Sequence, residues 1–253
     1  MDFDKYKLFW PDYANVDYDL ATRIIIDRAK KNKSFGVSAL AVHGLMTSLT
    51  DESLGKVINN IDLIVPDGQP VRWALNSFYK LGMKDRVYGP ELTLKVLSAA
   101  NDNNLSVFLY GSNQITSDLF KSFIQSEFPN VKIVGQHIDR FREATSEEDK
   151  IDIERINSSK ANIVFVGRGC PRQEFWVANH KGSVNAVMMA VGAAFDFHAG
   201  TLAQAPEWMQ KNGLEWLYRL TKEPQRLWKR YLVTNTHFVL KFFKNKVILK
   251  RPY

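Results

Sequence analysis

The sequence has a single cysteine and no long apolar stretch. Cys170 has no second cysteine to pair with, which excludes an intramolecular disulfide. A membrane-spanning helix needs about 18 or more apolar residues, and no uncharged stretch of the chain is that long. The opening segment, MDFDKYKLFW, lacks the basic, apolar and small-residue pattern of a secretory signal. These absences predict a cytoplasmic protein.

The common phosphate-binding and metal-binding motifs are also missing. There is no G-x-x-x-x-G-K-[ST], so the chain is not a P-loop protein. VGRGCPRQE contains G-x-G without the third glycine of a dinucleotide fingerprint, which argues against a nucleotide-dependent oxidoreductase. The D-x-D pairs, Asp2/Asp4 and Asp17/Asp19, precede the first predicted core strand, so we do not interpret either as a clamp for a metal ion and a diphosphate. No His/Cys cluster has the spacing of a zinc site. We therefore expect neither a cofactor nor a bound metal ion.

The chain does have an ordinary globular composition, with 45% hydrophobic and 24% charged residues among 253. Short apolar runs alternate with helix-compatible stretches, which predicts an α/β fold with a mostly parallel sheet and helices on both faces. The apolar runs cover residues 37–42, 63–65, 107–110, 131–134, 163–166 and 186–191. The predicted helices cover residues 51–60, 90–101, 115–127, 147–158 and 173–180.

A glycine closely follows every apolar run. In open α/β sheets, ligands bind beyond the carboxyl ends of the strands. Glycine there lets the backbone approach a ligand, and a following helix N-terminus favours phosphate. Tight strand-to-helix turns also need glycine, so any single glycine of the series could serve either a turn or a ligand site. The series indicates a nucleotide or phosphate site, and its members are Gly44, Gly68, Gly111, Gly135, Gly167 with Gly169, and Gly192.

Several polar side chains occupy the same strand ends. Asp67, in LIVPDGQPVRW, is either a turn residue or a general base in a ligand cleft. His43 is either a satisfied core histidine or a group that binds sugar or phosphate. Gln173 opens a predicted helix, where its amide could bind a ligand, and Asp196 either binds ribose hydroxyls or caps the next segment. Cys170 lacks an evident His/Asp partner, so we expect it to pack rather than react.

The excess positive charge is confined to the end of the chain. Residues 201–253 hold eleven Lys or Arg and three acids, a net +8, whereas residues 1–200 carry −1. We therefore divide the chain into an α/β catalytic core, 1–200, and a basic, aromatic helical appendage, 201–253. Basic residues among tryptophans suit a membrane surface or nucleic acid, and a solvated basic helix is the alternative. The core gives no support for nucleic-acid binding.

Within this appendage, GLEWLYRLTKEPQRLWKRYL predicts a helix, a break at Pro224 and a second helix. Arg219, Arg226 and Arg230 either bind a diphosphate or are surface charge. The following HFVLKFFKNKVILKRPY is either an interfacial membrane anchor or a helix packed on the core. Exposed apolar surface in this segment would also suit contact with a second subunit, so a homo-oligomer is an alternative to membrane binding.

Five segments together resemble the WecG/TagA/CpsF glycosyltransferases, glycosyltransferase family 26. The resemblance runs in order from residue 34 to residue 231. It implies a Rossmann-like fold and a metal-independent, inverting transfer of an N-acetylmannosamine-type or related hexose. The implied donor is a UDP-sugar, and the implied acceptor is a polyprenyl-diphosphate-linked saccharide at the inner face of the cell membrane, in cell-surface polysaccharide biosynthesis. The segments are IDLIVPDGQPV, DRVYGPELTLKVL, VFLYGS, VFVGRGCPRQEFW and VGAAFDFHAGTLAQAPEWMQKNGLEWLYRLTKEPQRLWKRYL.

The resemblance also implies roles for individual residues. Asp67 matches the proposed base of the P-D-G motif, Gln173 matches the glutamine of P-[KR]-Q-E, and Arg219 matches the arginine of L-[YF]-R-L. Arg226 and Arg230 match arginines of an appendage that closes over the active site. Together with the strand-end position of His43, these matches predict a catalytic set of Asp67, Arg219 and His43. The predicted substrate-binding residues are Gly68, Gln69, Gly111, Gly135, Gly167, Gln173, Gly192, Asp196, Arg226 and Arg230.

The chain departs from the family pattern in two places. The T-x-N found at the end of the first core strand is absent, and ALAVHG stands there instead. The threonine and asparagine roles cannot be carried over, and His43 is a candidate replacement for one of them. Gln69, Arg72 and Trp73 are atypical after P-D-G, so we expect this stretch to help choose the acceptor.

Overall fold

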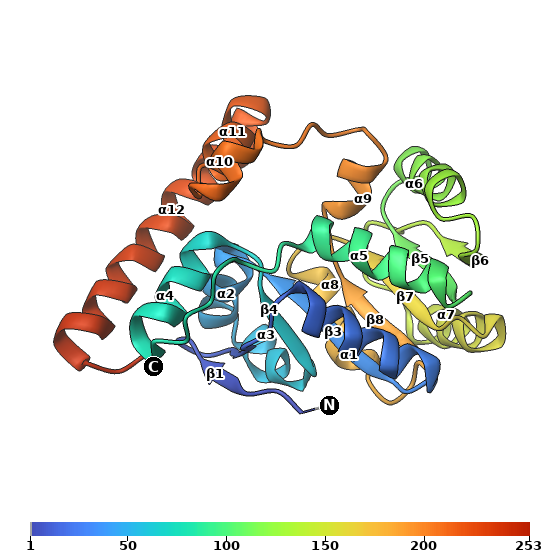
Figure 1. Ribbon diagram of the computed structural model, residues 1–253, viewed down its shortest axis with the longest axis horizontal. Helices are drawn as coiled ribbons and strands as arrows, with labels where there is room; N and C mark the ends of the chain where they lie inside the picture. Colours follow the sequence, from blue (N-terminus) through green and yellow to red (C-terminus); the bar gives the residue numbers. More distant parts are fainter. Residues whose placement is uncertain (1) are drawn as a thin grey trace.

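The computed structural model describes residues 2–253 and contains one six-stranded, all-parallel sheet (Figure 1). Its strand order is β4-β3-β8-β7-β5-β6. A separate antiparallel pair, β1 and β2, precedes it. The strands are β1 (Lys5–Lys7), β2 (Asp12–Ala14), β3 (Phe35–Leu40), β4 (Leu63–Pro66), β5 (Ser106–Gly111), β6 (Lys132–His137), β7 (Ile163–Gly167) and β8 (Val187–Ala190).

Helices cover both faces of the large sheet, and each face has its own hydrophobic core. One face carries α1 (Tyr18–Lys30), α5 (Gly89–Asp102), α6 (Gln114–Glu127) and α9 (Ala194–His198). The other carries α2 (Val42–Thr50), α3 (Glu52–Val57), α4 (Gln69–Tyr79), α7 (Ser146–Ser159) and α8 (Arg172–His180). The expected α/β, Rossmann-like architecture is confirmed.

Successive strand residues enter opposite cores. On β7, Val164 and Val166 belong to one core, whereas Ile163 and Phe165 belong to the other. Both sets are fully buried. A parallel strand covered on both faces must be apolar at every position, which is why these strands read as short continuous runs in the sequence.

Several predicted boundaries and omissions need correction. The run 37–42 does not stay extended to its end, because β3 ends at Leu40 and α2 begins at Val42. The predicted helix 51–60 is α3 followed by a 3₁₀ turn, Ile58–Asn60, and Asp51 caps its start by accepting from two backbone amides. Helices α1 and α4 were not predicted from the sequence. For α1 the signal was present, because Asp17 is its N-cap and accepts from the Leu20 amide at 2.8 Å.

The end of the chain forms three helices that lie beside the sheet. They are α10 (Glu207–Lys211), α11 (Glu215–Lys222) and the long α12 (Pro224–Phe243), which is followed by a π-helical segment, η2 (Lys244–Leu249). The predicted break at Pro224 is confirmed. In Figure 1, α12 runs along one side of the molecule and the C-terminus returns to β1 and α4. No helix within residues 2–253 is both long and apolar enough to cross a membrane.

Contacts in the later part of this C-terminal segment join it to the core. Buried Phe238 packs edge-on against Phe9, with ring centroids 5.8 Å apart. The backbone amide of Phe9 donates to the carbonyl of Pro252 at 2.8 Å. The C-terminal segment is therefore held against the N-terminal strands and α2, over the carboxyl ends of β3 and β4.

Candidate active site

Two adjoining cavities lie at the carboxyl edge of the sheet, where α2 and α9 leave β3 and β8 toward opposite faces. Such a divergence opens a crevice, which is where open α/β sheets bind ligands. The cavities measure about 510 Å³ and 310 Å³. Asp67, His43 and Arg219 line both.

The smaller cavity is polar, and arginines line it together with the carboxyl groups of Asp67, Glu174, Asp196 and Glu215. Its walls include Arg219, Arg226 and Arg230 from the C-terminal segment. The first turns of α2 and α8 also face it, and neither helix has a side-chain cap at its N-terminus. Uncapped backbone amides and the helix dipole both favour negative charge at such a place.

Gln173 and Gly192 fit together on the wall of this cavity. Gln173 is buried and its Nε2 donates to Glu174 Oε1 at 2.8 Å, whereas its Oε1 has no partner within residues 2–253. Gly192 has φ of +51°, and a Cβ there would lie 3.0 Å from Gln173 Oε1. Gly192 therefore needs to be glycine for both conformation and space. The arrangement leaves an amide oxygen free to accept a hydrogen bond from a ligand.

Asp67 follows β4 and is held by a single hydrogen bond. The Gly89 amide donates to its Oδ1 at 2.7 Å, and residues 2–253 offer its carboxylate no other. Burial raises the pKa of Asp67 to about 6, although the charge of Arg86 opposes the rise. A carboxylate with one free oxygen and a pKa near neutrality is suited to accept a proton.

The arginines differ in how they are paired. Arg219 Nη2 lies 3.6 Å from Glu223 Oε2, and Arg226 pairs with the same carboxylate at 2.9 Å. Arg230 has no ion pair or hydrogen bond to any residue from 2 to 253, and burial lowers its pKa. An arginine keeps its charge even so, which makes Arg230 an uncompensated cation on the cavity wall.

His43 lies at the start of α2, beside Arg230. Burial, helped by the charge of Arg230, lowers the pKa of His43 to about 4. The imidazole is therefore neutral at physiological pH, and its buried Nδ1 has no partner within the part of the chain that the structure describes. A neutral imidazole can donate from one nitrogen and accept at the other.

The larger cavity is mainly apolar. It lies between α4 and the C-terminal helices, and aromatic side chains supply much of its lining. The side-chain amide of Gln69 is a polar group in this lining, and one hydrogen bond fixes its orientation. Its Nε2 donates to Asp85 Oδ1 at 2.9 Å, and its buried Oε1 has no partner within residues 2–253. The aromatic lining residues are Trp73, Tyr88, Trp216, Tyr231, Phe238, Phe242 and Phe243.

The structure brings most of the predicted site residues together. Gly111 and Gly135 are the exceptions, because neither lines either cavity. A Cβ at Gly135 would overlap the ring of Phe108, and one at Gly111 would lie 2.9 Å from the Gly167 backbone, so strand packing accounts for both. The residues brought together are His43, Asp67, Gly68, Gln69, Gly167, Gln173, Gly192, Asp196, Arg219, Arg226 and Arg230.

For three residues singled out in the sequence, the structure gives surroundings that bear on their expected roles. Arg72 lines neither cavity, and its Nη1 donates to the carbonyls of Met83 and Lys84. Its contacts therefore hold the loop before Arg86. Asp196 lies inside α9 and does not cap α9 or α10. Burial raises the pKa of the Cys170 thiol well above its usual value, which suits a packing residue.

Arg86, Tyr88 and Glu215 line the larger cavity together and were not predicted from the sequence. Arg86 Nη2 lies 2.8 Å from Glu215 Oε2, and Tyr88 donates to the same carboxylate at 2.9 Å. The only sequence signal was their presence in two family-like segments, because an ion pair between distant residues leaves no local pattern.

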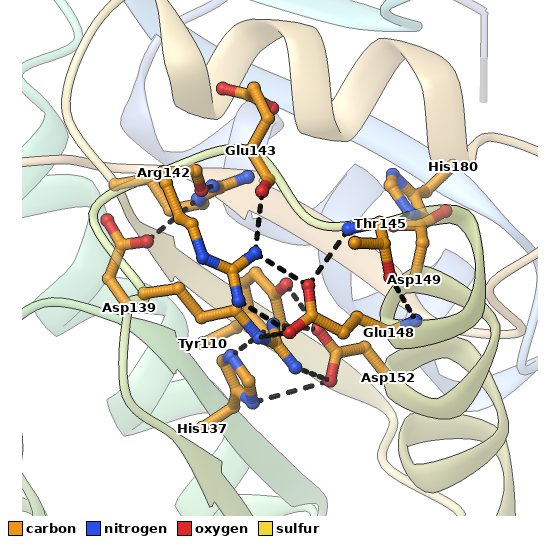
Figure 2. A network of polar contacts seen from close by, with 12 residues as sticks. Tyr110, His137, Asp139, Arg142, Glu143, Thr145, Glu148, Asp149, Asp152 and His180 are labelled. Carbon is orange, nitrogen blue, oxygen red and sulfur yellow. Dashed lines mark hydrogen bonds and ion pairs between the residues drawn. The ribbon is translucent and has the colours of Figure 1, made fainter.

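A second polar network lies beyond β5 and β6 and is drawn in Figure 2. Asp152 accepts from Arg140 at 2.6 Å and 3.0 Å and from the Tyr110 hydroxyl at 2.8 Å. Glu148 accepts from Arg142 and completes the capping box with Thr145 at the start of α7. The charges are satisfied by one another, so this network holds the β6–α7 connection rather than a ligand.

Within residues 2–253, no group of three or more His, Cys, Asp or Glu side chains is arranged to hold a metal ion. The positive charge at the crevice comes from the arginines described above.

Comparison with known proteins identifies relatives over most of the chain. The model of the Glycosyl transferase WecG/TagA/CpsF family matches residues 7–252. A Bacillus subtilis (strain 168) protein named N-acetylglucosaminyldiphosphoundecaprenol N-acetyl-beta-D-mannosaminyltransferase is 31% identical over 202 residues, 79% of this chain and 76% of the relative. Staphylococcus aureus proteins of the same name, from strains MRSA252 and MW2, are 31% identical over 207 residues, 80% of this chain and 77% of each relative.

Proposed function

The chain belongs to the WecG/TagA/CpsF family of glycosyltransferases, and we propose that it moves an N-acetylmannosamine-type sugar from UDP to a polyprenyl-diphosphate-linked saccharide. The names of the relatives specify an N-acetyl-β-D-mannosaminyl group and an N-acetylglucosaminyl-diphosphoundecaprenol acceptor. We propose the same substrate classes here, in the assembly of a cell-surface polysaccharide.

The observation that carries this proposal is the position of Asp67. It lines both the arginine-rich cavity and the apolar cavity. A nucleotide diphosphate suits the first, because it is anionic and polar. A lipid-linked saccharide suits the second, because its polyprenyl chain would be shielded from water by aromatic side chains. The carboxylate thus stands where a donor sugar and an acceptor hydroxyl would meet.

The proposed reaction is a single displacement with inversion. The acceptor hydroxyl oxygen forms a bond to the anomeric carbon while the bond from that carbon to the UDP oxygen breaks. Asp67 takes the hydroxyl proton, and UDP leaves with the electron pair of the broken bond. The pKa of about 6 supports this role, because the carboxylate is ionised at neutral pH yet basic enough to accept a proton.

Departure of UDP places negative charge on its diphosphate. Arg219 and Arg230 line the same cavity as Asp67, and Arg230 has no protein counter-charge within residues 2–253. We propose that both stabilise this charge, which fixed cations do most effectively in a site that excludes water. In this scheme the reaction needs no metal ion. The partner-free Gln173 Oε1 and His43 Nδ1 are proposed to bind hydroxyl or amide groups of the donor.

The acceptor's lipid requires the enzyme to work at a membrane surface, and α12 and η2 support such a contact. Leu240, Val247 and Ile248 are 62%, 64% and 72% exposed. Lys244 and Lys246 lie between Leu240 and Val247, and Lys250 follows Ile248. We propose that residues 201–253 form an appendage that binds the inner face of the cell membrane, where basic residues contribute about 1 kcal/mol each against anionic lipid.

A donor panel tests the proposed function directly. UDP release would be followed with UDP-N-acetylmannosamine, UDP-N-acetylglucosamine and UDP-glucose, each with and without N-acetylglucosaminyl-diphospho-polyprenol. We expect acceptor-dependent release with the N-acetylmannosamine donor and none from Asp67→Asn. The proposed transferase scheme would be wrong if UDP release were the same with and without acceptor. It would also be wrong if Asp67→Asn released UDP as the wild type does.

A further inference from the structure

One buried ion pair connects the core of the protein to its C-terminal helices. Arg86 Nη2 lies 2.8 Å from Glu215 Oε2, and the two side chains are only 8% and 13% exposed. Tyr88 OH donates to the other oxygen, Oε1, at 2.9 Å. Arg86 also donates to Gln210 Oε1 at 3.1 Å. Two core residues therefore hold one carboxylate from α11 and an amide from α10.

From this geometry we propose that Glu215 is a positioning residue, which locks α11 onto the core and thereby places Arg219 in the cleft with Asp67. The inference rests on the proposed function for its catalytic part. Its structural part concerns only how α11 is held and can be tested without any substrate.

Helix geometry connects the ion pair of Glu215 with the position of Arg219 in the cleft. Arg219 follows Glu215 by four residues on α11, so the two side chains share a face of that helix. Both line the larger cavity. Residues 2–253 supply no other ion pair between α11 and the core. Apart from this pair, Arg219 itself makes a charged contact with the core, because its guanidinium lies 5.9 Å from the centroid of the Phe197 ring on α9. When Glu215 is released, we expect this weaker contact to hold Arg219 less firmly in the cleft.

The same segment of the core also holds the proposed base. Arg86 and Tyr88 bind Glu215, and Gly89, the next residue, donates to Asp67 Oδ1 at 2.7 Å. Arg86 further stacks over the Tyr88 ring, 4.0 Å from its centroid. A short stretch of chain thus contacts the carboxylate of α11 at one end and the carboxylate that follows β4 at the other. Movement of α11 would be transmitted to Asp67 through it.

Asp67 and Glu215 also share the charge of Arg86. The Arg86 charge lowers the pKa of Asp67 and the Glu215 charge raises it, while Arg219 lowers it to a lesser extent. The other titratable neighbours, Tyr13, Tyr18 and Tyr88, have pKa values raised by burial and stay neutral. Removing Glu215 leaves Arg86 acting on Asp67 alone, whereas removing Arg86 leaves an unpaired Glu215 close to it.

The two partners should therefore have opposite effects on the acid limb of the pH–rate profile. Glu215→Gln should move the limb to lower pH, because Asp67 becomes more acidic. Arg86→Gln should move it to higher pH. Both should lower kcat, by about 10²-fold if Arg219 is displaced by an ångström. If the contact only supported the fold, kcat would fall in both variants, but the acid limbs of their pH–rate profiles would not move in opposite directions.

Hydrogen exchange provides the substrate-free readout. Amides of residues 215–222 should exchange faster in Glu215→Gln and in Arg86→Gln than in the wild type. The double variant should exchange more slowly than either single one, because it buries no unpaired charge. Glu207→Gln is the matched control, since Glu207 pairs only with Lys211 on its own helix, and it should leave exchange, kcat and the pH profile unchanged.

Two results would overturn the inference: unchanged exchange of residues 215–222 in Glu215→Gln, or acid limbs that move in the same direction in both variants. Failure of the proposed function is distinguishable from these. In that case the wild type would not release UDP in the presence of acceptor, while the exchange experiment would still decide whether Glu215 holds α11.

Discussion

The backbone amide of Gly89 donates a 2.7 Å hydrogen bond to Oδ1 of Asp67 and leaves Oδ2 without a partner from residues 2–253. The bond fixes the carboxylate by one oxygen, so the other can accept a proton. Asp67→Asn keeps this bond and the shape of the side chain but removes the basicity. We expect turnover to fall by about 10²–10⁴-fold. Protection of the fold by UDP in a thermal-shift assay should persist, and its loss would indicate a binding role instead.

The pKa of Asp67 predicts the acid limb of the wild-type enzyme. Burial raises that pKa to about 6, so the carboxyl group is protonated below pH 6 and cannot accept the acceptor proton. Turnover should therefore rise with pH through about 6 and level off above it. His43, with a pKa of about 4, does not change charge in this window. The profile would be measured as kcat/KM, and an acid limb near pH 4 would assign it to another group.

Arg219→Ala should reduce turnover more than donor binding. Its guanidinium is placed to stabilise charge that grows as UDP departs, and loss of one such group costs about 10²–10³-fold in comparable sites. Lys222→Ala removes a cation from the same helix without touching either cavity and serves as the control. A variant that retains wild-type kcat would exclude Arg219 from leaving-group stabilisation.

Gly192→Ala should weaken donor binding through Gln173. The new methyl group would lie 3.0 Å from Gln173 Oε1 and would also occupy a backbone conformation with φ of +51°. Gly182→Ala provides the control, because Gly182 has φ of +90° but no heavy atom within 4 Å of the place that a Cβ would take. Both variants should lose about 1–2 kcal/mol of stability from backbone strain. Only Gly192→Ala should raise the KM for the donor. Equal KM values in the two variants would mean that Gln173 does not bind the donor.

Apolar side chains of η2 should contribute to membrane binding. Ile248→Glu replaces a 72% exposed isoleucine among lysines and should weaken sedimentation with anionic vesicles by about tenfold, the effect of about 1.4 kcal/mol of lost apolar burial. Ile151→Glu alters a 60% exposed isoleucine on α7, away from the C-terminal helices, and should bind vesicles as the wild type does. Equal binding by both variants would place the membrane contact elsewhere.

The strands could be predicted from the sequence because burial on both faces leaves a direct local trace. The run at 163–166 is β7 almost residue for residue. Asp67 was ambiguous in isolation, since Pro-Asp-Gly is also turn chemistry, and the family resemblance made it the leading candidate base. The structure adds what no local pattern contains, namely that its carboxylate lies at the junction of a polar and an apolar cavity.

Predictions that depended on neighbours in space were less complete. Gly135 has the same position after an apolar run as Gly192, yet it accommodates the Phe108 ring whereas Gly192 accommodates Gln173. Sequence spacing cannot distinguish a glycine that packs from one that lines a cavity. Glu215 and Arg86 are separated by more than half of the chain, so their pairing follows only from the fold.

The apolar cavity has one wall from α4 and another from α12, which belong to early and late parts of the chain. A ribosome completes the sheet and the segment carrying Asp67 well before it releases Arg219, Arg230 and Phe238. The two walls of the cavity are therefore made at different times, and the segment that carries Asp67 precedes the arginines that face it. A chain cut before residue 219 would thus keep the candidate base but lack the arginines of α11 and α12 that line the same cavities.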